Sequence, residues 1–67
     1  MPYVNIRITD EKVSSEDKQA LIAGVTKVLQ DVLGKNPATT FVIIDEVNTD
    51  NWGIAGEQVT KRRARGQ

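Results

Sequence analysis

The sequence predicts a small α/β fold, α+β in the broader classification, built from a single βαβ unit with parallel strands and a short C-terminal hairpin or loop. Two strand-like patterns lie at residues 3–9 and 39–47, and a helical pattern separates them. A chain of 67 residues is long enough for one domain only. A strand, a crossover helix and a second strand of these lengths form a right-handed unit, so we expect the two strands to be parallel.

The first strand is expected at Tyr3 to Thr9. Val4, Ile6 and Ile8 alternate there with polar residues, which is typical of a strand with one buried face.

The helix is expected to begin at the pair Ser14-Ser15, where a hydroxyl cap precedes two acidic residues of the first turn. Gly34 fits the left-handed position after the last turn, and Pro37 prevents the helix from continuing. Apolar residues recur at helical spacing between these signals and form one stripe: Leu21, Ile22, Val25, Val28, Leu29, Val32 and Leu33.

The second strand is expected at Thr39 to Val47, and its run from Phe41 to Ile44 is apolar on both faces. One helix covers one face of a two-stranded sheet, so the other face and the sheet edges would meet water in a monomer. The chain has no Cys and no His to supply a disulfide or a structural metal site. We therefore expect the subunits to assemble through their sheets.

The segment Asn48 to Gly56 is dense in turn-forming residues around Trp52 and Ile54, which predicts a loop or short hairpin that reaches a neighbouring subunit. The sequence from Gln58 onward shows no periodic pattern of apolar residues. We expect residues 1–67 to form one domain that ends in a basic tail, residues 61–67, for which the sequence predicts no regular structure and allows disorder.

The overall charge gives no reason to expect a polyanionic partner. Nine Lys and Arg residues balance nine Asp and Glu residues, so the molecule has no net field that would favour nucleic acid or an anionic membrane. No apolar run approaches the roughly 20 residues that span a bilayer, and no signal-peptide pattern occurs. We expect a cytoplasmic protein.

Pro2 is the candidate catalytic residue. The chain lacks a Cys or His nucleophile–base pair, a cluster of metal ligands and a Gly-rich phosphate loop. Removal of Met1, which is expected before a small residue, would turn Pro2 into a secondary amine. An α-amino group titrates near about 7.7–8.0, and desolvation or nearby cations lower that pKa, so Pro2 could act as a general base at neutral pH. On the Met-Pro pair alone, a structural role at the start of a strand is favoured.

The context reverses that preference. The features of the chain follow one another in a definite order: Met-Pro, a short strand, a capped helix, and the blocks Ile43 to Glu46 and Trp52 to Glu57. This order resembles the 4-oxalocrotonate tautomerase family over nearly the whole chain. The resemblance implies βαβ subunits that form homohexamers, usually trimers of dimers, with active sites at subunit boundaries and no cofactor. It also implies that Pro2 moves a proton in a small unsaturated 2-oxo or 2-hydroxy acid through a dienol, first as base and then as acid.

The same resemblance assigns further site residues. Trp52 falls where the family has an aromatic residue that lines the pocket, although it would serve equally as an interface anchor. Lys12 lies near the family's first substrate-binding Arg, without the bidentate grip of a guanidinium. Phe41 aligns with the second Arg, so that cation is missing at its usual position. Arg62, or alternatively Arg7 or Arg63, would replace it by reaching a neighbour's pocket.

Two other functions stay open. The same scaffold could hydrate or dehalogenate an unsaturated acid with Pro2 as a general acid, which the missing Arg at Phe41 favours. A non-catalytic oligomeric binding protein is the second alternative, in which the residues from Lys61 to Arg65 contact nucleic acid or a protein partner.

Overall fold

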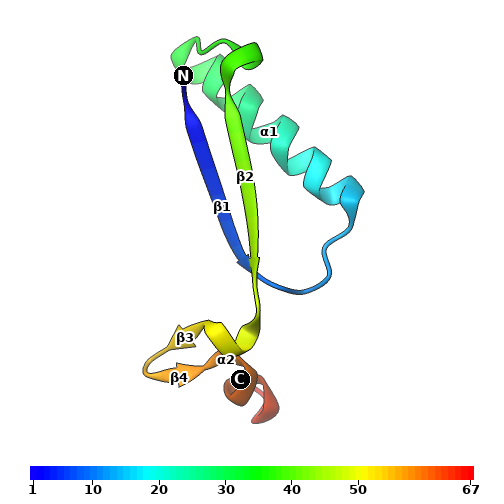
Figure 1. The fold of residues 1–67 in the computed structure, drawn as a ribbon, viewed down its shortest axis with the longest axis vertical. Coiled ribbons are helices and arrows are strands. Elements are labelled where there is room, and N and C mark those ends of the chain that lie inside the picture. The colour runs from blue at the N-terminus through cyan, green and yellow to red at the C-terminus, as the bar shows by residue number, and fades with distance from the viewer.

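A computed structural model describes all 67 residues, Met1 to Gln67. The chain forms one βαβ unit followed by a small C-terminal unit of a hairpin and a helix (Figure 1). Two short 3₁₀ turns, Pro37–Thr39 and Thr49–Asn51, flank the second strand. The regular elements are β1 (Tyr3–Thr9), α1 (Ser15–Leu33), β2 (Phe41–Val47), β3 (Gly53–Ile54), β4 (Glu57–Gln58) and α2 (Val59–Ala64).

The βαβ unit confirms the predicted fold class. β1 and β2 pair in parallel from Tyr3 opposite Phe41 to Thr9 opposite Val47. β1 has the predicted bounds, whereas β2 begins two residues later than expected. The cause lies in the 3₁₀ turn before it, where the Asn36 side chain accepts a hydrogen bond from the Ala38 N–H over 2.9 Å and a Pro occupies the first position.

The predicted caps of α1 are also confirmed. The Asp17 N–H donates to Ser14 Oγ over 3.1 Å, which satisfies one of the free N–H groups of the first turn. Gly34 takes a left-handed conformation with φ 67° and donates its N–H to the Gln30 carbonyl over 2.9 Å. These local contacts set both ends of the helix.

The two faces of the sheet have different surroundings. Lys18 of α1 forms an ion pair with Glu46 of β2, so the face that contains Glu46 is the face that α1 covers. The opposite face is open: Tyr3 is 60%, Phe41 54% and Ile43 48% exposed. The alternation of half-buried and exposed residues along both strands follows from the two-residue period of a strand.

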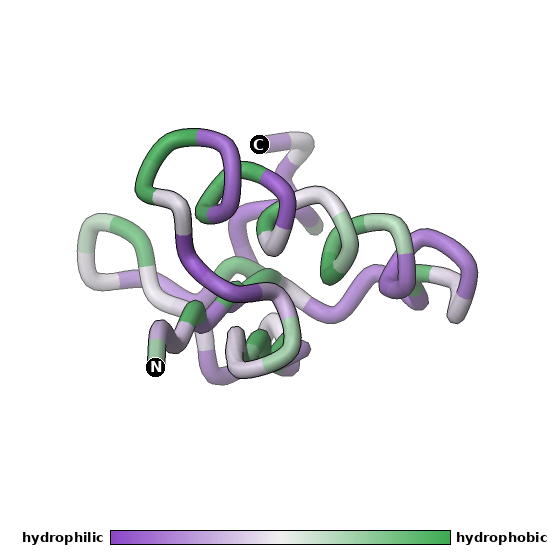
Figure 2. The backbone as a smooth tube through the Cα atoms, turned by 90° about the horizontal axis from the view of Figure 1, so that it is seen from above, coloured by the Kyte–Doolittle hydropathy of each residue, from purple (hydrophilic) through white to green (hydrophobic).

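The chain alone has almost no interior. Val59, at 5% exposure, is its one buried residue, and apolar segments lie on several sides of the molecule rather than in one core (Figure 2). The radius of gyration is 15.3 Å, whereas a compact domain of this length has about 11 Å. Much of the apolar stripe of α1 also faces outward: Leu21, Ile22, Val28, Val32 and Leu33.

The C-terminal unit lies at the carboxyl end of β1 and β2, far from the N-terminus (Figure 1). β3 and β4 form the expected short hairpin, with Ala55 and Gly56 as its two-residue loop. No periodic pattern marks the sequence from Gln58 onward, yet residues 59–64 form α2. The helix depends on contacts rather than on periodicity: its Val59 N–H donates to the Trp52 carbonyl over 2.8 Å. Neither helix combines the length and apolar character needed to cross a bilayer.

The hairpin loop provides a test of the local backbone. Ala55 has φ 53° and Gly56 φ 80°, the two positive values that a type I′ turn requires, for which Asn-Gly is preferred. We expect Ala55→Asn to raise the free energy of unfolding by about 0.5–1 kcal/mol. Denaturant unfolding at fixed subunit concentration measures it. Ala55→Val, a β-branched residue at positive φ, should lower stability, and an increase with both variants would contradict the turn geometry.

Candidate active site

Pro2 and Phe41 lie together at the amino end of the sheet. The Phe41 N–H donates to the Pro2 carbonyl over 3.0 Å, which extends the β1–β2 ladder by one bond. Pro2 is half-buried and Phe41 is exposed on the open face. The candidate base is therefore joined to the backbone of Phe41, and no cation of its own subunit is bonded there.

Trp52 and Arg62 lie at the opposite end, in the wall of an open cavity of about 460 Å³. The end of β1, the hairpin and α2 together enclose this cavity. Arg7 also lines it and additionally lines a second hollow on the other side of Trp52. Three arginine side chains, those of Arg7, Arg62 and Arg63, and an indole ring thus line one space, which suits a small anion with an unsaturated carbon chain.

The two groups of candidate residues lie far apart within one chain. A seven-residue strand is about 20 Å long, and β1 separates Pro2 from the cavity around Trp52 (Figure 1). One subunit consequently holds the candidate base at one end and the candidate binding cavity at the other.

Backbone bonds on both sides hold Trp52 in place. The Asn48 side chain accepts a hydrogen bond from the Asp50 N–H over 2.8 Å and starts the 3₁₀ turn. Trp52 follows that turn and donates its N–H to the Thr49 carbonyl over 3.4 Å. Because Val59 bonds the Trp52 carbonyl and is itself buried, α2 closes the back of the cavity behind the indole.

Lys12 lies at the same end of the sheet but outside the cavity wall. It has φ 57°, and its N–H donates to Asp10 Oδ1 over 3.1 Å in a tight turn. Its neighbour Glu11 does line the cavity and pairs with Arg63 of α2. That pair joins the loop after β1 to α2, and the arginine lowers the pKa of Glu11.

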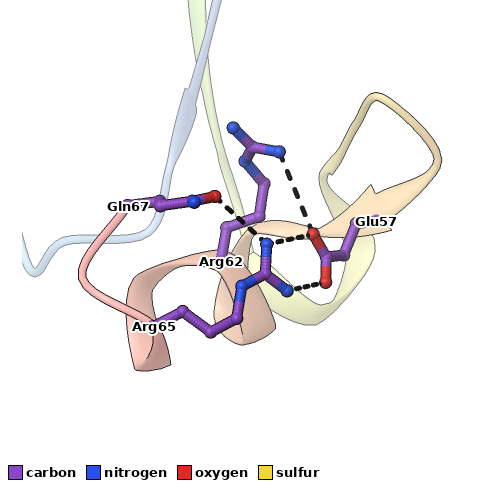
Figure 3. Close-up of polar contacts among 4 residues, drawn as sticks. All are labelled: Glu57, Arg62, Arg65 and Gln67. Carbon is purple, nitrogen blue, oxygen red and sulfur yellow. Dashed lines mark hydrogen bonds and ion pairs between the residues drawn. The ribbon is translucent and has the colours of Figure 1, made fainter.

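Glu57 organises the arginines of the C-terminal unit (Figure 3). Arg65 donates to both carboxylate oxygens of Glu57, with Arg65 Nη2 at 2.6 Å from Oε1. Arg62 Nη1 lies 3.9 Å from the same Oε1 and makes no hydrogen bond. The hydrogen bonds from Arg65, and secondarily the charge of Arg62, lower the pKa of Glu57.

The structure adds site residues that the sequence patterns did not reveal. Arg7 and Arg63 were only alternatives to Arg62, yet all three line the cavity, together with Thr9 and the C-terminal Gln67. The crowding of cations after Lys61 was a signal, but α2 had to be known before these residues could be placed. No group of three or more acidic or histidine side chains gathers where a metal ion could be held.

Comparisons with known proteins identify similar chains. A family model described as "Tautomerase enzyme" matches residues 2–62. Probable tautomerase K2 of Dickeya dadantii is 71% identical over 63 residues, which cover 94% of each chain. The 2-hydroxymuconate tautomerase of Comamonas testosteroni is 39% identical over 56 residues, 84% of this chain and 87% of that one. The solved structure of TomN, a 4-oxalocrotonate tautomerase homologue in the tomaymycin biosynthetic pathway, has a TM-score of 0.91 at 26% identity and covers 98% of this chain and 100% of its own.

The ion pairs predict a loss of stability in acid. The pKa of Glu57 is lowered from 4.5 in the folded chain, so its contribution is complete above pH 4.5 and disappears as the pH falls through the folded value. Thermal unfolding midpoints measured from pH 7 to pH 3 should fall, and should fall less in Glu57→Gln, which has no carboxylate to protonate. Parallel curves for the two proteins would contradict the pairing. Salt should weaken the effect because the groups are exposed.

Proposed function

The chain belongs to the tautomerase family, and we propose on this basis that it is an isomerase of small unsaturated 2-oxo or 2-hydroxy acids with Pro2 as its general base. The reaction passes through a dienol and uses no cofactor. The relative that is named a 2-hydroxymuconate tautomerase supports 2-hydroxymuconate as the first substrate to test.

One observation carries the proposal: Pro2 and the cavity around Trp52 lie at opposite ends of a sheet whose second face is uncovered. In an assembly that covers this face, Pro2 of one copy meets the Trp52 cavity of another. Burial of a Phe or Ile side chain contributes roughly 1.5–3 kcal/mol, and Phe41 and Ile43 have about half of that still to gain. The assembly we propose is a homohexamer, a trimer of dimers.

Pro2 requires the loss of Met1 for this role, since a peptide bond to Met1 makes its nitrogen a non-basic amide. The match to the family model begins at residue 2, which supports that start. In the mature subunit the secondary amine enters a space that contains Arg62 and Arg7 of a neighbour. These cations disfavour the protonated amine and lower its pKa towards neutrality.

The proposed steps use groups on both subunits. The Pro2 nitrogen takes the proton of the 2-hydroxyl group, and the protonated amine returns it to a carbon of the conjugated chain. Trp52 excludes water from that space. Arg62 binds a carboxylate or the oxygen on which negative charge develops, and Lys12 adds positive charge from the adjoining loop.

Phe41, where the family resemblance implies an arginine, supports a site whose second cation comes from another position. Loss of an arginine that bonds the developing enolate lowers the reaction rate by about 10²–10³-fold unless another group replaces that bond. Phe41 is bonded to Pro2 through the backbone, and its apolar side chain supplies no cation there. The guanidinium of Arg62 replaces that cation from the other side of the cavity.

The first test is Pro2→Ala. We expect the rate of 2-hydroxymuconate ketonisation, followed by absorbance, to fall at least about 100-fold because the positioned base is lost. Lys35→Ala, an exposed position at the end of α1, is the control and should keep the wild-type rate. Equal rates in Pro2→Ala and the wild type would exclude Pro2 as the base. Mass spectrometry of the wild type and of Lys35→Ala should show chains that begin at Pro2.

The pKa of the Pro2 nitrogen separates this function from its alternative. A value near neutrality, measured by NMR titration of labelled proline, supports the base. A value well above neutrality would instead favour Pro2 as a general acid in a hydratase or dehalogenase. Phe41 in place of an arginine is the observation that motivates that alternative.

A second test asks whether two subunits share one site. Pro2→Ala and Arg62→Ala should each be nearly inactive alone, since each lacks one half of the site. After unfolding, mixing in equal amounts and refolding, about a quarter of the sites should combine an intact Pro2 with an intact cavity if pairing is random. Activity should return to about that fraction of the wild type. No recovery from mixtures that form hybrid oligomers would contradict a shared site.

A further inference from the structure

Two arginines lie within reach of the single carboxylate of Glu57: Arg65 forms hydrogen bonds to it, whereas Arg62 makes only a long ion pair with it (Figure 3). Arg65 uses both terminal nitrogens on the two oxygens and adds a third bond to Gln67 Oε1 at 3.1 Å. Arg62 remains 3.9 Å from Oε1. A fork-to-fork pair of this kind satisfies the carboxylate and neutralises its charge.

The hydrogen-bond donors of Arg62 consequently remain unused, although its charge is paired with Glu57 at long range. A guanidinium has five N–H donors, and none of those on Arg62 makes a hydrogen bond within the chain. Its side chain is only 28% exposed, and it lines the cavity together with Trp52. Figure 3 shows its guanidinium group above that of Arg65, joined to Glu57 only by the long ion pair. A partly buried cation with unused donors is suited to bind an incoming carboxylate.

Arg65 itself does not line the cavity. It is 48% exposed and caps the carboxyl end of α2, three residues after Arg62. Residues at this spacing share one helix face, so both arginines can reach Glu57, but only Arg62 also reaches the cavity. Without Arg65, the free carboxylate would need to move about 1 Å to form a hydrogen-bonded pair with Arg62.

We propose that Arg65 is a positioning residue that occupies Glu57 and thereby leaves Arg62 free to bind the carboxylate of the substrate. This inference rests on the proposed function in one respect, the assignment of Arg62 as the substrate-binding cation. It predicts that the loss of Arg65 lets Glu57 capture Arg62 and brings an uncompensated negative charge to the cavity wall. The effect falls on substrate binding, because Pro2 comes from another subunit.

The test compares Arg65→Met with the double variant Glu57→Gln/Arg65→Met in the full-length, assembled protein. Trp52 is the one tryptophan of the chain, so its fluorescence reports occupation of the cavity. The probe is muconate, a dicarboxylate that lacks the hydroxyl group and cannot tautomerise. Arg65→Met should bind muconate about tenfold more weakly than the wild type, as expected when a charged hydrogen bond is lost.

The double variant distinguishes positioning from simple structural support. With Gln at position 57 no carboxylate competes for Arg62, so muconate affinity should return to near the wild-type value although the Glu57–Arg65 pair is still absent. With 2-hydroxymuconate as substrate, KM should rise in Arg65→Met more than kcat falls, and should recover in the double variant. An unchanged affinity in Arg65→Met, or a double variant as weak as Arg65→Met, would overturn the proposal.

Arg65→Lys keeps one donor on Glu57 and should weaken muconate binding less than Arg65→Met. If Arg65→Met does not assemble, Arg65→Lys with and without Glu57→Gln provides the same comparison. Failure of the proposed function gives a different result: Pro2→Ala would then retain activity while the muconate affinities still follow the charge on Glu57. If Arg62→Ala bound muconate as well as the wild type, the assignment of Arg62, and the inference with it, would be wrong.

Discussion

A two-stranded sheet that is covered on one face only is the constraint on which this structure depends. α1 packs against one face and leaves Phe41 and Ile43 in contact with solvent on the other. No second layer exists within the chain, and Val59 alone is buried. The radius of gyration exceeds that of a compact domain of equal length. The stability of the fold and its assembly are therefore expected to be one property, dependent on subunit concentration.

The same geometry divides the chemistry. The parallel register places Pro2 beside Phe41 at one end of β1, and the cavity around Trp52 lies past the other end. No rotation of side chains brings these groups together across the length of a strand. Membership of the tautomerase family and this division lead to the same conclusion, a site that two subunits complete. Catalysis and assembly would then be lost together.

The charges around the cavity show a further division of roles. Arg63 holds the loop after β1 through Glu11, and Arg65 occupies Glu57. Both pairs are exposed, and pairs of this kind contribute little to stability. Their effect is on arrangement: they tie α2 to the loop after β1 and to the hairpin, and leave Arg62 with only a long ion pair and no hydrogen bond. In the proposed site, the cation comes from Arg62 on a helix of only six residues.

Local patterns determined the βαβ unit and its bounds, except for the start of β2. Alternation in β1, the Ser14 cap and Gly34 act within a few residues, so they could be recognised without the fold, and the resemblance to the 4-oxalocrotonate tautomerase family is confirmed. Pro2 as the base remains a prediction from that resemblance. The tertiary structure decided what depends on distant contacts: α2 is held by the bond from the Val59 N–H to the Trp52 carbonyl and by the burial of Val59. The cavity is enclosed by segments that sequence order does not bring together, and only their packing shows which arginine is left free.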